Sequence, residues 1–305
     1  MAPNYVDMHV PTPDGNRMMS KLEAADEGRS FWPFIASVVI SPDEASMRLQ
    51  LAEIRSSGCR HVEVEWPFTL PAPTSTEILR FCAALEENRL QLASVHLYGG
   101  NRSQGDDGLA CKPTKRAVFD ASLPAIAEIA ARSGCTKFVC PYGQPDPSDP
   151  ASVTHLAAAD SVAGLAHLVA EYGGEVLLQP AGRSAPGNNP LRTVEDVCAV
   201  VDGLLRPLGA ENVRLSLSQS SLRHDGVDVL GVVRRFGTRV GRFGVVEDPG
   251  SIAFEAIAAS VSTAGYSGMV TVDWSRYLCG RQVPPIDGSM PPDARSRLRL
   301  GSLHQ

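Results

Sequence analysis

The sequence is poor in lysine and lacks the short patterns that would define a function class directly. Four lysines stand at positions 21, 112, 115 and 137, and the net charge is −6. That charge gives no sign of a nucleic-acid surface. No G-x-G-x-x-G, P-loop or G-x-S-x-G pattern is present. These absences argue against nucleotide-dependent enzymes and serine hydrolases, and we expect a small molecule as the ligand.

The sequence also shows no membrane or secretion signal. No stretch approaches the roughly 18 to 20 apolar residues that span a bilayer, and no apolar signal core follows a basic start. The seven cysteines are scattered and form no C-x-x-C pair. We therefore expect buried free thiols in a cytoplasmic protein with no membrane partner.

Eight short apolar runs alternate with helix-length amphipathic segments. Repeated strand-then-helix units of this length imply a parallel sheet, and eight of them close into a (β/α)₈ TIM barrel. A doubly wound open sheet is the alternative, but the first expected strand has no glycine-rich turn after it. We predict a polar lead-in over residues 1–30, the barrel over 31–277 and a tail over 278–305. The expected strands are 34–40, 61–66, 90–97, 137–141, 175–179, 213–218, 242–246 and 269–274. The expected helices are 42–57, 75–87, 115–133, 152–172, 193–204, 227–236 and 254–264.

Five segments, in the same order along the chain, resemble those of a known family. They are similar to hydroxypyruvate isomerases, within the xylose-isomerase-like barrels of sugar phosphate isomerases and epimerases. The resemblance runs from about residue 31 to residue 277. The segments that carry it are residues 60–68, 105–110, 177–180, 248–250 and 265–268.

The resemblance implies a divalent metal held at four strand ends, usually by Glu, Asp, Gln or His, and Glu. In this register the four positions hold Gln179, Ser218, Gly244 and Asp273. A hard divalent ion prefers several anionic oxygen ligands. We therefore expect no metal cofactor, with a weakly held Mn or Mg in a rearranged site as the alternative. Gln179 cannot accept a proton, so the two-glutamate proton transfer that the resemblance implies also fails.

Four residues remain as candidates for acid and base chemistry. Active sites of this architecture lie at the C-terminal ends of the strands. His96 ends the third expected strand, and an imidazole exchanges protons near neutral pH. Glu63 and Glu65 share one parity on the second strand, so one or both are expected to face the interior, although a structural role fits them equally. Asp273 occupies a strand end where the resembling family places a reactive carboxylate.

Five further residues are candidates for substrate binding. Gln179, Ser218 and Tyr98 follow or end strands and could bind a hydroxylated ligand. Arg242 could hold a substrate carboxylate or phosphate, or it could neutralise Asp273 or Glu247. Glu247 is the fifth candidate, next to the seventh strand.

The sequence thus predicts an isomerase- or epimerase-like enzyme. It would transfer a proton on a small oxygenated substrate, in an isomerisation, an epimerisation or a related lyase or cyclase step, without the family's metal. One alternative is a metal-dependent sugar or hydroxypyruvate-type isomerase with a rearranged site. The other is a non-catalytic barrel that acts as a binding partner. A homodimer is left open.

Overall fold

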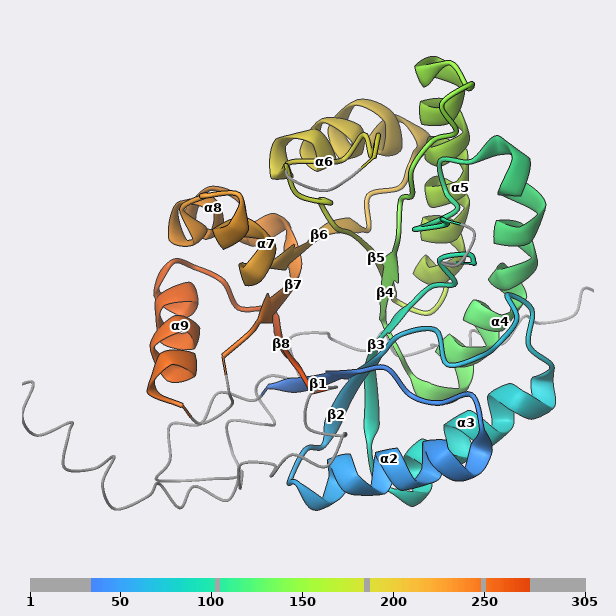
Figure 1. Ribbon diagram of the computed structural model, residues 1–305, viewed down its shortest axis with the longest axis vertical. Coiled ribbons are helices and arrows are strands. Elements are labelled where there is room, and N and C mark those ends of the chain that lie inside the picture. Colours follow the sequence, from blue (N-terminus) through green and yellow to red (C-terminus); the bar gives the residue numbers. More distant parts are fainter. Residues whose placement is uncertain (1–33, 102–104, 184–186, 248–250, 275–305) are drawn as a thin grey trace, which may run out of the picture.

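The described part of the chain forms a closed barrel of eight parallel strands, which confirms the predicted (β/α)₈ fold (Figure 1). The computed structural model describes residues 34–101, 105–183, 187–247 and 251–274. The predicted lead-in and tail lie outside these residues. Each strand pairs with the next, and β8 closes the barrel on β1. The strands are β1 Ile35–Val38, β2 His61–Val64, β3 Gln91–His96, β4 Lys137–Cys140, β5 Glu175–Leu178, β6 Val213–Ser218, β7 Val240–Val245 and β8 Met269–Asp273.

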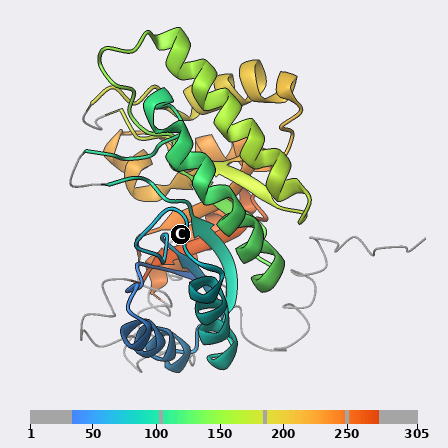
Figure 2. The same ribbon diagram turned by 90° about the vertical axis from the view of Figure 1, so that its right-hand side faces the viewer.

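The helices lie outside the barrel, and Figure 2 shows α4 and α5 next to each other. Residue chemistry marks several helix ends. Thr74 and Glu77 form a reciprocal capping box at the start of α3, and Gly134 ends α4 in a left-handed conformation. The helices are α2 Glu44–Ser56, α3 Ser75–Glu87, α4 Arg116–Ser133, α5 Ala151–Ala170, α6 Val194–Val200, α7 Gln219–His224, α8 Val229–Phe236 and α9 Ile252–Thr263.

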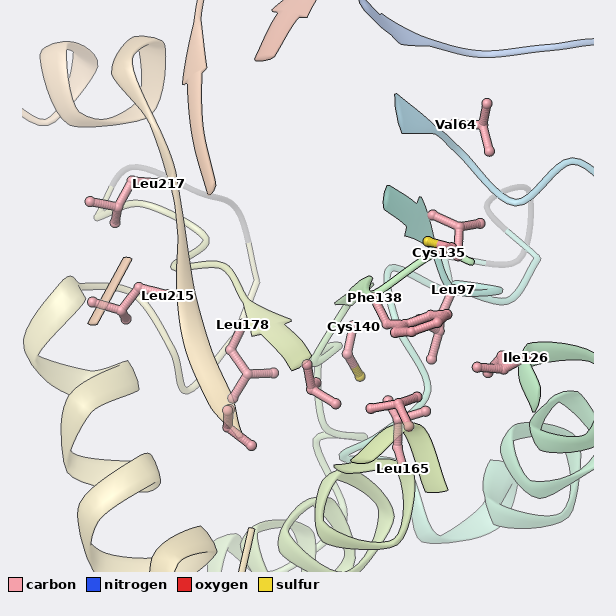
Figure 3. Packing of buried hydrophobic residues seen from close by; sticks show 14 of the residues in the cluster. Val64, Leu97, Ile126, Cys135, Phe138, Cys140, Leu165, Leu178, Leu215 and Leu217 are labelled. Atoms are coloured by element: carbon pink, nitrogen blue, oxygen red, sulfur yellow. The ribbon is translucent and has the colours of Figure 1, made fainter. Parts of the chain in front are cut away.

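The main hydrophobic core lies between the strands and the helices. Figure 3 shows Phe138, Cys140 and Leu178 on the side of β4 and β5 that faces Leu165 of α5. Side chains alternate along each strand, so the residues between them face the barrel interior. A second set of side chains therefore fills the barrel interior, and some of these side chains are charged.

One helix, α5, is long and apolar enough to cross a membrane by length and composition alone. The sequence interpretation did not anticipate such a segment. Half of its most apolar window is buried within the fold. Because α5 packs against β5 and α4, the burial of its apolar face explains its composition.

Three local features differ from the sequence prediction. The polar run after β6, for which no helix was predicted, forms the short helix α7. Helix α6 passes into a π-helical turn at Val201–Leu205. Strand β7 begins at Val240, two residues earlier than predicted. The early start depends on Gly241, since a Cβ there would lie 2.5 Å from the side chain of Leu177.

The cysteines of the described chain are free, as predicted. All of them except Cys82 are buried. Burial raises the pKa of Cys135 and of Cys140 to about 12. A thiol with that pKa stays protonated at neutral pH, so these cysteines act as core side chains.

Candidate functional site

A buried carboxylate, Glu63 of β2, lies at the centre of the barrel interior. It is 0% exposed. Its Oε1 and Oε2 each accept a hydrogen bond of 2.6 Å from Arg242 of β7, donated by Nη2 and Nε. The hydroxyls of Ser37 on β1 and Ser94 on β3 donate to the same two oxygens at 2.7 and 2.5 Å. Glu63 therefore joins strands from opposite sides of the barrel.

The Glu63–Arg242 pair is the floor of the barrel mouth. Burial by itself raises the pKa of Glu63, but the positive charge of Arg242 and the nearby His96 hold that pKa well below its usual range. Arg242 is 8% exposed and its Nη1 also donates to Ser216 of β6 at 3.3 Å. Glu63 is thus a fixed anion whose acceptor positions are taken, and it is poorly placed to exchange protons with a substrate.

His96, at the end of β3, lies directly above this floor. Its Nε2 is 3.2 Å from Oε1 of Glu63, close enough for an ion pair when the ring is protonated. Nε2 is buried and makes no hydrogen bond within the described residues, so its contact with Glu63 is electrostatic. The side chain is 22% exposed, and it lies at the C-terminal end of β3. Among the four acid–base candidates, His96 is the one that is partly exposed and also lies next to the buried carboxylate of Glu63.

The strand register places three more candidates on the interior side. Asp273 pairs with Ser37, whose hydroxyl faces the interior, so Asp273 faces the same way. It is exposed at the end of β8. Glu65 follows Glu63 at the same parity and is partly exposed. Gln179 follows β5 two residues after the inward Leu177.

The remaining substrate-binding candidates lie at the rim and are more involved in local contacts. The Ser218 hydroxyl is 2.8 Å from that of Ser220 at the start of α7. Tyr98 packs edge-on against Trp66, with ring centroids 6.5 Å apart. Glu247 accepts a hydrogen bond of 2.7 Å from Arg223 of α7. These contacts give Ser218, Tyr98 and Glu247 a structural role that is an alternative to substrate binding.

The structure shows which carboxylate Arg242 pairs with, a question that the sequence left open. The guanidinium pairs with Glu63 rather than with Asp273 or Glu247. Two serines and a threonine of the interior, Ser37, Ser94 and Thr271, were missed as candidates. Their only sequence signal is inward parity on strands next to Glu63 or Gly244.

The four strand-end positions do not fit a divalent metal. They offer one carboxylate, one amide, one hydroxyl and a glycine, Gly244. Within the described residues no group of three or more His, Cys, Asp or Glu is arranged to hold a metal ion. A Cβ on Gly244 would lie 3.2 Å from Nη1 of Arg242. A permanent cation next to a ligand position disfavours a second cation there.

Comparisons with known proteins agree with this architecture. No family model matches the chain. A putative hydroxypyruvate isomerase of Streptomyces coelicolor is 27% identical over 234 residues, covering 73% of this chain and 83% of that protein. The structure of a family 2 AP endonuclease from Brucella melitensis has a TM-score of 0.65 at 16% identity, covering 79% of this chain and 93% of that one. A 3-keto-D-glucoside 4-epimerase from E. coli has a TM-score of 0.59 at 15% identity, covering 88% and 99%.

The fold is a (β/α)₈ barrel of the same architecture as these neighbours, which also include a xylose isomerase-like TIM barrel protein from Mycobacterium smegmatis with a TM-score of 0.57 at 13% identity, covering 79% of this chain and 89% of that one. The resemblance to hydroxypyruvate isomerases is confirmed by two curated relatives of that name. The prediction of an isomerase- or epimerase-like enzyme is confirmed at that level.

Proposed function

We propose that the barrel mouth transfers a proton on a small hydroxycarbonyl compound without a resident divalent metal. The observation that carries the proposal is the position of His96. Its side chain is partly exposed at the C-terminal end of β3 and lies against a buried charged pair. Hydroxypyruvate is the first substrate to test, because both curated relatives are named for it.

His96 is the proposed acid and base. Nε2 faces Glu63, which leaves Nδ1 as the nitrogen available to a substrate. Such a positioned general base contributes about 10² to 10⁴ in rate. Glu63 and Arg242 act as positioning residues for the ring. Asp273 and Glu65, on the same rim, are the candidates for the second proton-transfer group.

Deuterium exchange and isomerisation of hydroxypyruvate, followed by NMR in D₂O, test the proposal. We expect exchange that EDTA leaves intact and that His96→Gln lowers at least about 100-fold. The matched control is His167→Gln, an exposed histidine near the end of α5. That variant is expected to keep the wild-type rate.

Other outcomes select the alternatives. Activity that is lost with EDTA and restored by Mn would support a rearranged metal site. A folded protein with no exchange on hydroxypyruvate, dihydroxyacetone or glycolaldehyde would support a non-catalytic barrel. Wild-type exchange in the His96 variant would exclude His96 as the base.

A further inference from the structure

The interior face of β7 carries no side chain at Gly244. Its neighbours Phe243 and Val245 are buried, whereas Gly244 is partly exposed. A Cβ built on Gly244 would lie 3.2 Å from Nη1 and 3.5 Å from Nη2 of Arg242. It would also lie 3.5 Å from Oγ1 of Thr271, the residue paired with it on β8. The space above Gly244 is therefore bordered by a guanidinium on one side and a hydroxyl on the other.

The guanidinium of Arg242 has N–H donors that are not used within the described part of the protein and could bind a ligand beside Gly244. An arginine carries five N–H donors. Three of them are used, two by Glu63 and one by Ser216. Both terminal nitrogens of Arg242 adjoin the Gly244 position. The Glu63 carboxylate also fixes the plane of the guanidinium, so the donors are held in place before a ligand arrives.

Thr271 supplies an independent observation. It is 1% exposed, and its Oγ1 makes no hydrogen bond within the described residues. A buried hydroxyl without a partner is unfavourable for folding. Its proximity to the Gly244 space is consistent with a binding role.

We propose that Arg242 and Thr271 form an oxyanion subsite above Gly244. It takes a planar pair of anionic oxygens, as in a carboxylate or in the enediolate of a hydroxyketone. Guanidinium geometry matches such a pair, with two parallel N–H donors. In this subsite a fixed guanidinium lies beside Gly244, one of the four positions that the resemblance assigns to metal ligands. This inference rests on the proposed function, because it places the subsite in the same barrel mouth. Its test measures binding and does not require catalytic turnover.

Calorimetric titration tests the subsite with two probes. Glycolate represents the carboxylate, and acetohydroxamate represents a planar enediolate. We expect the wild-type protein to bind at least one of them, and the stronger probe identifies the source of the oxygens. Thr271→Val should weaken that binding about tenfold, as loss of one hydrogen bond to an anion does. Gly244→Ala should weaken it at least as much, because the methyl group fills the space.

A matched variant separates binding from packing. Thr154 of α5 is also buried, but its hydroxyl donates to the carbonyl of Ala151 at 2.9 Å. Thr154→Val should lower the Tm and leave binding unchanged. Thr271→Val should leave the Tm unchanged or raise it, because no hydrogen bond is lost. A fall in Tm for Thr271→Val with wild-type binding would overturn the proposal.

The two proposals fail separately. If neither probe binds, or if both variants bind as wild type does, the oxyanion subsite is wrong even where deuterium exchange is observed. If the probes bind as expected but no exchange occurs, the subsite stands and the proposed function falls. Gly244 has no left-handed backbone conformation, so the backbone of β7 suits alanine, and the added methyl group would contact Nη1 of Arg242 closely.

Discussion

Two charged clusters lie inside the same barrel, and they differ in depth. The floor pair, Glu63 and Arg242, is almost completely buried and lies toward the C-terminal mouth. The lower cluster is formed by Lys137, Glu175 and Arg214 near the N-terminal ends of β4, β5 and β6. Its side chains are 26 to 34% exposed. Both clusters use the same residue chemistry, so burial and hydrogen bonding account for what distinguishes them.

The contrast indicates two roles. In this fold the N-terminal end contributes to stability, and the C-terminal end holds the active site. A partly exposed cluster keeps part of its contact with water, so its ion pairs contribute less to stability. A buried pair is costly to form, and it persists where geometry and extra hydrogen bonds compensate the charges. The floor pair has two-point contact between the guanidinium and the carboxylate, and Ser37, Ser94 and Ser216 add further hydrogen bonds.

The largest expected effect in this comparison comes from Glu63→Gln. Removing one partner leaves the buried Arg242 charge uncompensated, which costs about 3–5 kcal/mol of unfolding free energy. Urea unfolding at pH 7 measures the loss. The double variant Glu63→Gln with Arg242→Met should recover much of it, because no buried charge remains. A loss below about 1 kcal/mol in the single variant would place this pair in the same class as exposed ion pairs.

The pH dependence of stability should reveal the same carboxylate. The folded-state pKa of Glu63 lies well below the usual value of 4.5. Below about pH 4.5 the unfolded state takes up a proton that the folded state does not, so stability falls. The contribution of Glu63 is complete above that pH and is lost as the pH falls through the folded-state pKa. Urea unfolding of wild type and Glu63→Gln from pH 7 to 3 should show the difference between them shrinking in acid. A constant difference over that range would contradict the prediction.

The smallest effect is expected for Glu175→Gln in the lower cluster. Its ion pairs with Lys137 and Arg214 are partly exposed, so its loss should cost no more than about 1 kcal/mol. The cost should shrink further in 1 M salt, whereas that of Glu63→Gln should change little. Urea unfolding at low and high salt checks both. A large, salt-independent cost at Glu175 would remove the distinction between the clusters.

Much of the fold could be predicted because its signals are local. Strand β6 and helix α3 have the predicted bounds, since apolar runs and capping residues mark them directly. The short helix α7 was missed because Gln219 to Ser221 are polar and carry no apolar periodicity. The early start of β7 was missed because Gly241 carries no side chain that would extend the apolar run back to Val240. In the fold it admits the Leu177 side chain.

The sequence predicted several residues of the candidate site, but it did not predict which of them contact one another. Parity on the second strand put Glu63 among the candidates, but one sequence could not say which cation it would meet. Arg242 is 179 positions away and reaches Glu63 across the closed barrel. Thr271 gave no signal beyond its inward parity, because an isolated threonine in an apolar strand looks like an ordinary strand residue.

The sequence by itself determined the alternation of strands and helices, the closure into a barrel and the poor set of metal donors. These properties follow from hydrophobic periodicity and residue chemistry, both of which are local. Only the tertiary structure decided that Glu63 is a buried anion paired with Arg242. Only the structure placed beside Gly244 a guanidinium edge and a hydroxyl that has no hydrogen-bond partner among the described residues. The reason is physical: barrel closure brings distant strands within hydrogen-bond reach, and burial then sets the strength of the charges.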